Sequence, residues 1–81
     1  MKEAFELTLA GRTYLLHRLD HPEMEKTAYR IEFRHGGQPL SFRMTRSGDH
    51  WVRIPQSLPY YVNMDGCLLA DAIAQNESES L

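Results

Sequence analysis

The stretch YRIEFRHGGQPLSFRM, residues 29–44, decides the fold, because apolar and polar residues alternate on both sides of a glycine pair. Such alternation is typical of β-strands that lay one face on a core. Gly36 and Gly37 accept the positive φ angles of a type I′ turn, which joins two antiparallel strands. The turn matches the apolar residues in three pairs: Phe33 with Leu40, Ile31 with Phe42, and Tyr29 with Met44. A slip of one residue would break all three pairs, so we expect this register.

A similar hairpin precedes it. Apolar and polar residues alternate over residues 5–9, and Ala10-Gly11 connects them to RTYLLHRL, residues 12–19. A two-residue turn there predicts two apolar pairs, Leu7 with Tyr14 and Phe5 with Leu16. Leu15 and Leu19 then project from the opposite face of the second strand. Apolar residues on both faces indicate a strand that is covered on both sides.

The stretch TRSGDHWVRIP, residues 45–55, favours a third hairpin, with Arg46-Ser47-Gly48 as a three-residue loop. The expected register comprises five pairs: Leu40 with Ile54, Phe42 with Val52, and Met44 with His50 on the apolar face, and Arg43 with Trp51 and Ser41 with Arg53 on the other face. The apolar face agrees with the one that the Gly-Gly turn sets. We therefore interpret the stretch as a structural turn, with Trp51 on the face opposite to Phe42.

After this hairpin, residues 56–62 fit either an irregular segment or a short extra strand. Asp65 or Asn63 can cap a helix that runs to about Gln75. The expected apolar stripe of the helix comprises Leu68, Leu69, Ala72 and Ile73. Strands followed by a helix indicate the α+β class, and we predict a five-stranded antiparallel meander with one C-terminal helix on its apolar face. Residues 1–76 make one domain, and residues 77–81 a frayed polar tail.

The chain has 81 residues and one cysteine, Cys67, so it holds one domain at most and no internal disulfide. A domain of this size buries only about 60% of its unfolded surface, and a second copy or a partner commonly adds stability. The opening residues alternate in polarity, and no stretch approaches the roughly 20 apolar residues of a membrane span. We expect a cytoplasmic protein with no membrane contact.

The sequence offers little chemistry of a catalytic or metal-binding kind. The histidines and the cysteine show none of the spacings of common metal sites: His17, His21, His35, His50 and Cys67. A thiol in the first turn of a helix has a lowered pKa, which would suit a nucleophile, but we interpret Cys67 as a small buried apolar residue. No two carboxylates are placed as an acid–base pair. We therefore predict no metal, no cofactor and no enzymatic activity.

One polar constellation stands out on the exposed sheet face: Arg30, Glu32, Arg43, Trp51 and Arg53. An aromatic ring among guanidinium groups can stack on a nucleic-acid base while its neighbours meet phosphates. Alternatively, an arginine covers the Trp51 ring and Glu32 balances the nearby charge. The formal net charge of the chain is −2, and residues 54–81 hold four acids and no lysine or arginine. This balance favours the second interpretation.

An apolar group outside the expected core predicts self-association. The candidate partner surface comprises Leu15, Leu19, Tyr60 and Tyr61. Exposed apolar patches commonly mark partner surfaces, and a two-fold dimer is the commonest solution. The leading hypothesis is a non-enzymatic protein-interaction module that works as a homodimer or on another protein. The alternative is a nucleic-acid-binding module that uses the arginine and tryptophan face.

Four motifs carry a resemblance to known proteins: G-R-T-Y (residues 11–14), Y-R-I-E-F (29–33), L-S-F-R-M (40–44) and G-D-H-W-V-R-I (48–54). With them the chain resembles small bacterial proteins of unassigned activity that pair a meander sheet with a C-terminal helix. The order of strands and helix is also similar to that of the PUR-type nucleic-acid-binding repeat. That resemblance implies two paired copies and a nucleic-acid site on the sheet.

Overall fold

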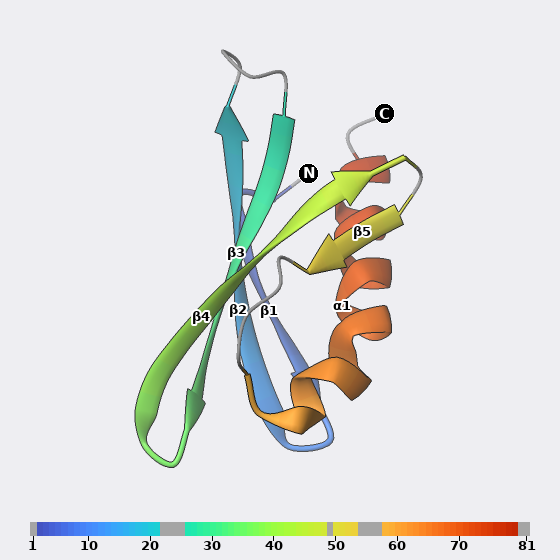
Figure 1. Cartoon of the computed structure of the whole chain (residues 1–81). Helices are drawn as coiled ribbons and strands as arrows, with labels where there is room; N and C mark the ends of the chain where they lie inside the picture. Colours follow the sequence, from blue (N-terminus) through green and yellow to red (C-terminus); the bar gives the residue numbers. More distant parts are fainter. Residues whose placement is uncertain (1, 22–25, 49, 54–57, 80–81) are drawn as a thin grey trace.

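The computed structural model describes residues 2–21, 26–48, 50–53 and 58–79. Five strands precede one helix: β1 (Ala4–Leu9), β2 (Arg12–His21), β3 (Lys26–His35), β4 (Gln38–Ser47), β5 (His50–Arg53) and α1 (Tyr60–Ser78). The strands form one antiparallel sheet in the order β1-β2-β3-β4-β5, so neighbours in sequence are neighbours in the sheet (Figure 1). The α+β meander with a C-terminal helix is confirmed.

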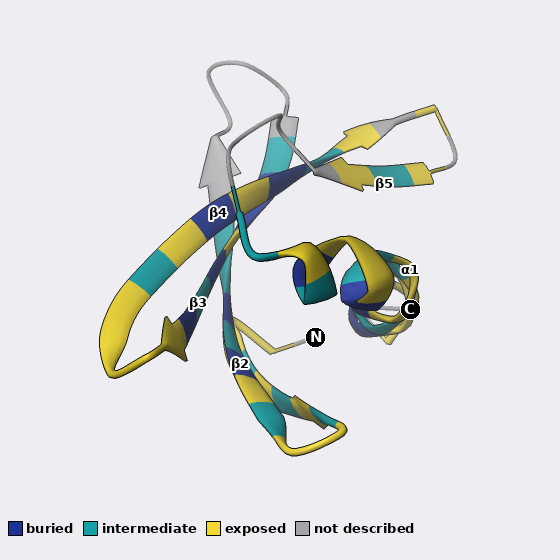
Figure 2. Ribbon diagram, turned by 60° about the horizontal axis from the view of Figure 1, so that its bottom comes forward, coloured by how far each residue is buried: buried dark blue, intermediate teal, exposed yellow. Residues whose placement is uncertain are grey.

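The sheet curls around α1, which lies on its concave side and contacts both edge strands, β1 and β5 (Figure 1). We call the side toward the helix the inner face and the opposite side the outer face. Buried and exposed positions alternate along β3 and β4, as expected where only one face is covered (Figure 2). Within the described residues, no helix has the length and apolar character that crossing a bilayer requires.

The first two predicted hairpins have the expected registers. Leu7 pairs with Tyr14 across the β1–β2 turn, and Ile31 pairs with Phe42 in the β3–β4 hairpin. Both turns use two residues with positive φ: Ala10 (49°) and Gly11 (81°) in the first, Gly36 (59°) and Gly37 (82°) in the second. These angles are those of the type I′ turn, whose twist matches that of the strands.

The predicted register of the third hairpin is wrong by three residues. The observed pairs are Met44 with Arg53, Thr45 with Val52, Arg46 with Trp51, and Ser47 with His50. Because side chains alternate along a strand, an odd shift exchanges the faces on which the described side chains of β5 lie. Trp51 therefore lies on the inner face, the same face as Phe42, and Val52 lies on the outer face.

The packing of Trp51 explains this register. Its ring meets the ring of Tyr29 edge-on, with centroids 5.4 Å apart and planes at 90°, and it packs against the core. Val52 is left 43% exposed. An indole buries more apolar surface than a valine side chain, and an edge-to-face ring pair adds further stabilisation. The turn between Ser47 and His50 has two residues instead of the expected three, and Gly48 still has a positive φ of 62°.

The helix is longer than expected and presents a different face to the sheet. It begins at Tyr60, within residues 56–62, for which we expected an irregular segment or a short strand, and it ends at Ser78. Its buried residues are Val62, Asp65, Leu69, Ile73 and Asn76. Leu68, expected in the apolar stripe, is 52% exposed. Asp65 and Asn63, the two expected caps, both lie inside the helix, and the 3.6-residue period turns Asp65 inward. Glu77, expected in a frayed tail, is helical.

The register of β5 can be tested by truncating its two apolar residues. Trp51→Ala removes an aromatic ring from the core, and we expect it to cost about 2–4 kcal/mol of the free energy of unfolding. The melting temperature should fall by roughly 10 °C or more. Val52→Ala, a change in the next residue on the outer face, should cost less than about 1 kcal/mol. Thermal unfolding followed by circular dichroism measures both, and equal losses would contradict the observed register.

Candidate interaction surfaces

An arginine, a tyrosine and a carboxylate join the N-terminal half of α1 to β2. Arg12 donates to Asp65 from Nε and Nη2, each at 2.9 Å, and the Tyr14 hydroxyl donates to Asp65 Oδ2 at 2.5 Å. Arg12 and Tyr14 are two residues apart in β2, so both side chains reach the inner face. Asp65 is only 4% exposed. We call these three residues the N-terminal clamp.

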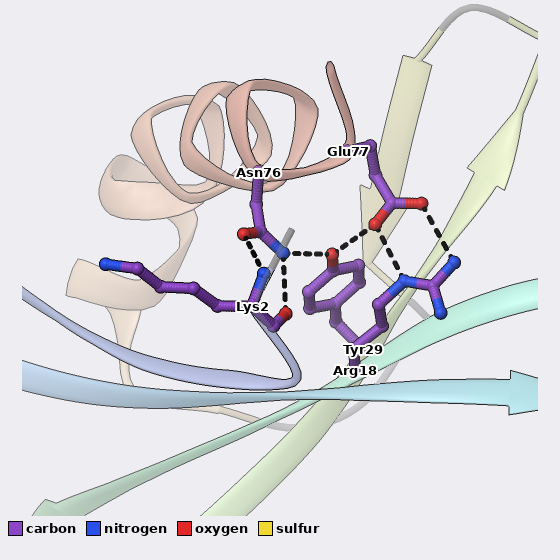
Figure 3. A network of polar contacts seen from close by, with 5 residues as sticks. All are labelled: Lys2, Arg18, Tyr29, Asn76 and Glu77. Atoms are coloured by element: carbon purple, nitrogen blue, oxygen red, sulfur yellow. Dashed lines mark hydrogen bonds and ion pairs between the residues drawn. The ribbon is translucent and has the colours of Figure 1, made fainter. Parts of the chain in front are cut away.

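A second set of the same three groups joins the other end of α1 to the sheet (Figure 3). Arg18 donates to Glu77 from Nε at 2.8 Å and from Nη2 at 3.4 Å. The Tyr29 hydroxyl donates to Glu77 Oε2 at 2.5 Å and accepts from Asn76 Nδ2 at 2.8 Å. Asn76 also bonds to both main-chain groups of Lys2, each at 2.9 Å. We call Arg18, Tyr29 and Glu77 the C-terminal clamp.

The clamps fix the protonation states of their members. Hydrogen bonds from Arg12 lower the pKa of Asp65 and outweigh its burial. Burial acts to raise the pKa of Glu77, but hydrogen bonds from Arg18 and Tyr29 outweigh it, and the pKa is lowered. Burial and the bond to Glu77 raise the pKa of Tyr29 to about 12. The carboxylates are thus ionised and this phenol is neutral at pH 7, which suits attachment of the helix rather than proton transfer.

The structure does not assemble the predicted arginine and tryptophan face. Arg30 and Arg43 are paired in the β3–β4 ladder, with Glu32 two residues along on the same outer face. The shifted register of β5 removes Trp51 to the inner face, and the side chain of Arg53 lies outside the described residues. The expectation that Trp51 lies among these arginines is therefore wrong. Whether the remaining face binds a ligand stays a prediction.

Glu32 balances part of the charge on this outer face. Its carboxylate accepts a hydrogen bond from Arg30. Its other oxygen lies 3.6 Å from His17 Nε2, on the neighbouring strand β2. Exposed pairs of this kind contribute little to stability, but they reduce the positive potential that a phosphate would meet. Arg43 makes no ion pair within the described part of the chain.

The four residues of the predicted apolar partner surface come from two elements, β2 and α1. Leu15 and Leu19 are half-buried on the outer face. Tyr61 packs between Phe33 and Tyr60, with its ring centroid 6.2 Å from that of each. Tyr60 remains 77% exposed. Whether Leu15 and Leu19 contact a partner stays a prediction.

Sequence reasoning missed two exposed apolar residues of α1. Met64 is 69% exposed and Leu68 is 52% exposed. With Tyr60 they are spaced at i, i+4 and i+8, so they line one side of the helix. We call Tyr60, Met64 and Leu68 the helix stripe. The spacing was visible in the sequence, but it gains meaning only if the helix begins at Tyr60.

Two hollows of similar size lie on the surface of the described residues. A cleft of about 540 Å³ lies between β2 and β3, lined by Gly11, Arg12, Thr13, Leu15, Glu32, Phe33, Arg34, Pro39 and Tyr61. A groove of about 510 Å³ separates β5 from α1, with Trp51 on one wall and Cys67 on the other. Cys67 is exposed, so its interpretation as a buried residue is wrong. Among the described residues, no group of histidine, cysteine and acidic side chains is arranged to hold a metal ion.

Comparison of the chain with models of protein families, with curated proteins and with solved structures finds no match. The resemblances to small meander-sheet proteins and to the PUR-type repeat therefore stay predictions.

The N-terminal clamp can be tested with a matched pair of aspartates on one helix. Asp65→Ala removes the hydrogen-bond acceptor of the buried Tyr14 hydroxyl and of the Arg12 guanidinium. We expect it to lower the free energy of unfolding by about 2–4 kcal/mol. Asp71→Ala changes an exposed aspartate of α1 and should alter stability by less than about 0.5 kcal/mol. Urea unfolding measures both. Similar losses for the two variants would show that Asp65 does not carry the attachment.

The C-terminal clamp predicts a loss of stability at high pH. The pKa of Tyr29 is raised from 10.0 to about 12 in the fold, so its contribution is complete below pH 10 and is lost as the pH rises through about 12. Wild type should therefore exceed Tyr29→Phe in stability at pH 7, and this difference should shrink between pH 10 and pH 12. Urea unfolding of both proteins at pH 7, pH 10 and pH 12 measures the difference in the free energy of unfolding. A constant difference would contradict the clamp.

Proposed function

We propose that this chain is a non-enzymatic interaction module that works as a homodimer through the helix stripe. One observation carries the proposal: three of the four large apolar residues that are exposed in the described part of the chain lie on one side of α1. Soluble domains seldom leave such residues grouped in water, and grouped ones usually mark a partner surface. The buried carboxylate of Asp65 and the partly buried carboxylate of Glu77 are bound in the clamps, which supports a structural rather than a catalytic role for them.

A second copy of the chain fits the helix stripe better than a charged partner. Between Tyr60 and Leu68 the only charged residue is Asp65, which is buried and bound to Arg12. The exposed acids Asp71, in the helix, and Glu79, directly after its end, both follow the stripe. In an antiparallel pair of helices the stripes overlap, while the acidic ends point to opposite sides of the interface. Such an arrangement is two-fold and self-complementary.

The geometry of this pair places Met64 at the two-fold axis, because it is the middle residue of the stripe. Tyr60 of each copy then faces Leu68 of the other. At about 1.5 Å of rise per residue, Gln75 lies roughly 16 Å from the axis and outside the overlap. Three side chains from each copy bury less accessible surface than a standard interface, which buries at least about 1,200 Å² in total. We therefore expect a weak dimer.

The dimer can be tested by placing a charge at its centre. At about 200 µM protein, light scattering should give an average mass above that of one chain, rising with concentration. Met64→Lys places two like charges at the axis and should give the mass of one chain at every concentration. Gln75→Lys adds the same charge further along the helix and should behave as wild type. A wild type that stays at the mass of one chain would refute the dimer.

Cross-linking tests the predicted geometry independently of affinity. In a Cys67→Ser background, Met64→Cys should form an intermolecular disulfide under mild oxidation, because the two thiols meet at the axis. Gln75→Cys in the same background should form far less, since its two copies lie about 30 Å apart along the helices. Non-reducing electrophoresis separates the products. Equal cross-linking of the two variants would contradict the antiparallel arrangement.

A further inference from the structure

The sheet splits between β2 and β3. Their ladder ends at the pair of Leu15 and Glu32, although both strands continue, to Arg12 and to His35. Beyond that pair the β1–β2 hairpin and the β3–β4 hairpin spread apart, and their turns lie far from each other in both views (Figures 1 and 2). The cleft of about 540 Å³ lies at this split. It is therefore bounded by two strand edges rather than by loops.

Main-chain groups on both walls of the cleft lack a ladder partner. In a hairpin with a two-residue turn, the residues that flank the turn bond to each other, and the bonding direction then alternates along the strand. This alternation turns the N–H and C=O of Thr13 away from β1 and toward β3. The same rule turns those of Arg34 away from β4 and toward β2. The β2–β3 ladder does not extend to Thr13 and Arg34, so these groups face the cleft.

The side chains of the cleft offer apolar contacts and one uncompensated charge. Phe33 and Tyr61 lie on its inner side, and Leu15 and Pro39 on its outer side. The two other charged residues of the lining have partners: Arg12 is bound to Asp65, and Glu32 to Arg30. Arg34 donates only to the carbonyl of Gly37, at 3.3 Å, and meets no carboxylate in the described part of the chain.

We propose that the cleft binds an extended peptide segment of a partner protein, which adds a strand between β2 and β3. Extended main chain supplies the donors and acceptors that Thr13 and Arg34 lack, as in other cases of strand addition. Side chains of an added strand point alternately to the two faces. An apolar side chain of the segment then meets Phe33 and Tyr61, and an acidic one on the outer side meets Arg34. This site is distinct from the helix stripe and does not depend on the dimer.

An NMR titration with a designed peptide tests the site. The probe is acetyl-Val-Asp-Val-Asp-Val-amide, which alternates apolar and acidic residues, added to ¹⁵N-labelled protein up to about 1 mM. The expected result is a set of amide shifts centred on Thr13, Leu15, Glu32 and Arg34. The Met64→Lys variant should show the same shifts, because the cleft does not require a second copy. Shifts centred on the helix stripe or on the free edge of β1 would overturn the proposal, as would no shifts at all.

Two controls separate strand addition from loose adhesion. A peptide N-methylated at both Asp residues keeps the side chains but loses two main-chain donors, and we expect it to bind at least about tenfold more weakly. Arg34→Glu should weaken the binding of the aspartate peptide by roughly threefold or more. The same variant should prefer a peptide in which both Asp residues are replaced by Lys. Arg43→Glu, at an exposed arginine outside the cleft, should preserve the preference for aspartate. Equal binding of the methylated peptide, or no change in preference with Arg34→Glu, would overturn the proposal.

Discussion

The attachment of α1 to the sheet by two arginine–carboxylate–tyrosine clamps is the constraint on which the rest of the structure depends. Arg12 and Arg18 are six residues apart in the strand, which corresponds to about 20 Å. Asp65 and Glu77 are twelve residues apart in the helix, which corresponds to about 18 Å. The two spacings match only if the helix runs parallel to β2. Each clamp alone would leave the helix free to pivot, whereas both together fix its direction and its rotation.

This fixed rotation determines which surfaces remain for a partner. Because Asp65 and Asn76 point inward, the opposite side of the helix, with Tyr60, Met64 and Leu68, faces water. The beginning of the helix also sets the position of Tyr61, whose ring lies 5.0 Å from the Arg12 guanidinium. The helix stripe and the lining of the cleft are thus consequences of one attachment, although they lie on different surfaces. A small domain without a disulfide here gains rigidity from buried polar bonds in addition to its apolar core.

The sequence predicted what local patterns determine. The alternation around Gly36-Gly37 allows only one strand register that pairs apolar residues with apolar residues, and the structure shows this register. The third hairpin has two acceptable turns near Gly48, and the choice depends on Trp51 meeting Tyr29, a contact between distant parts of the chain. No local pattern reports such a contact. Local sequence offers Asp65 or Asn63 as a helix cap, because the true partners of Asp65, Arg12 and Tyr14, lie some 50 residues earlier. The one available signal was an arginine at an inward position of β2, which implies a buried carboxylate.

Double-mutant cycles across the two clamps test this account most directly. Single and paired substitutions of Arg12, Arg18, Asp65 and Glu77 by apolar residues would be compared by urea unfolding. We expect Arg18 and Glu77 to be coupled by about 1–3 kcal/mol, and Arg12 and Asp65 to be coupled with the same sign. The crossed pairs, Arg12 with Glu77 and Arg18 with Asp65, should show no measurable coupling, because they lie at opposite ends of the helix. Crossed pairs coupled as strongly as matched pairs would contradict the parallel, doubly clamped helix.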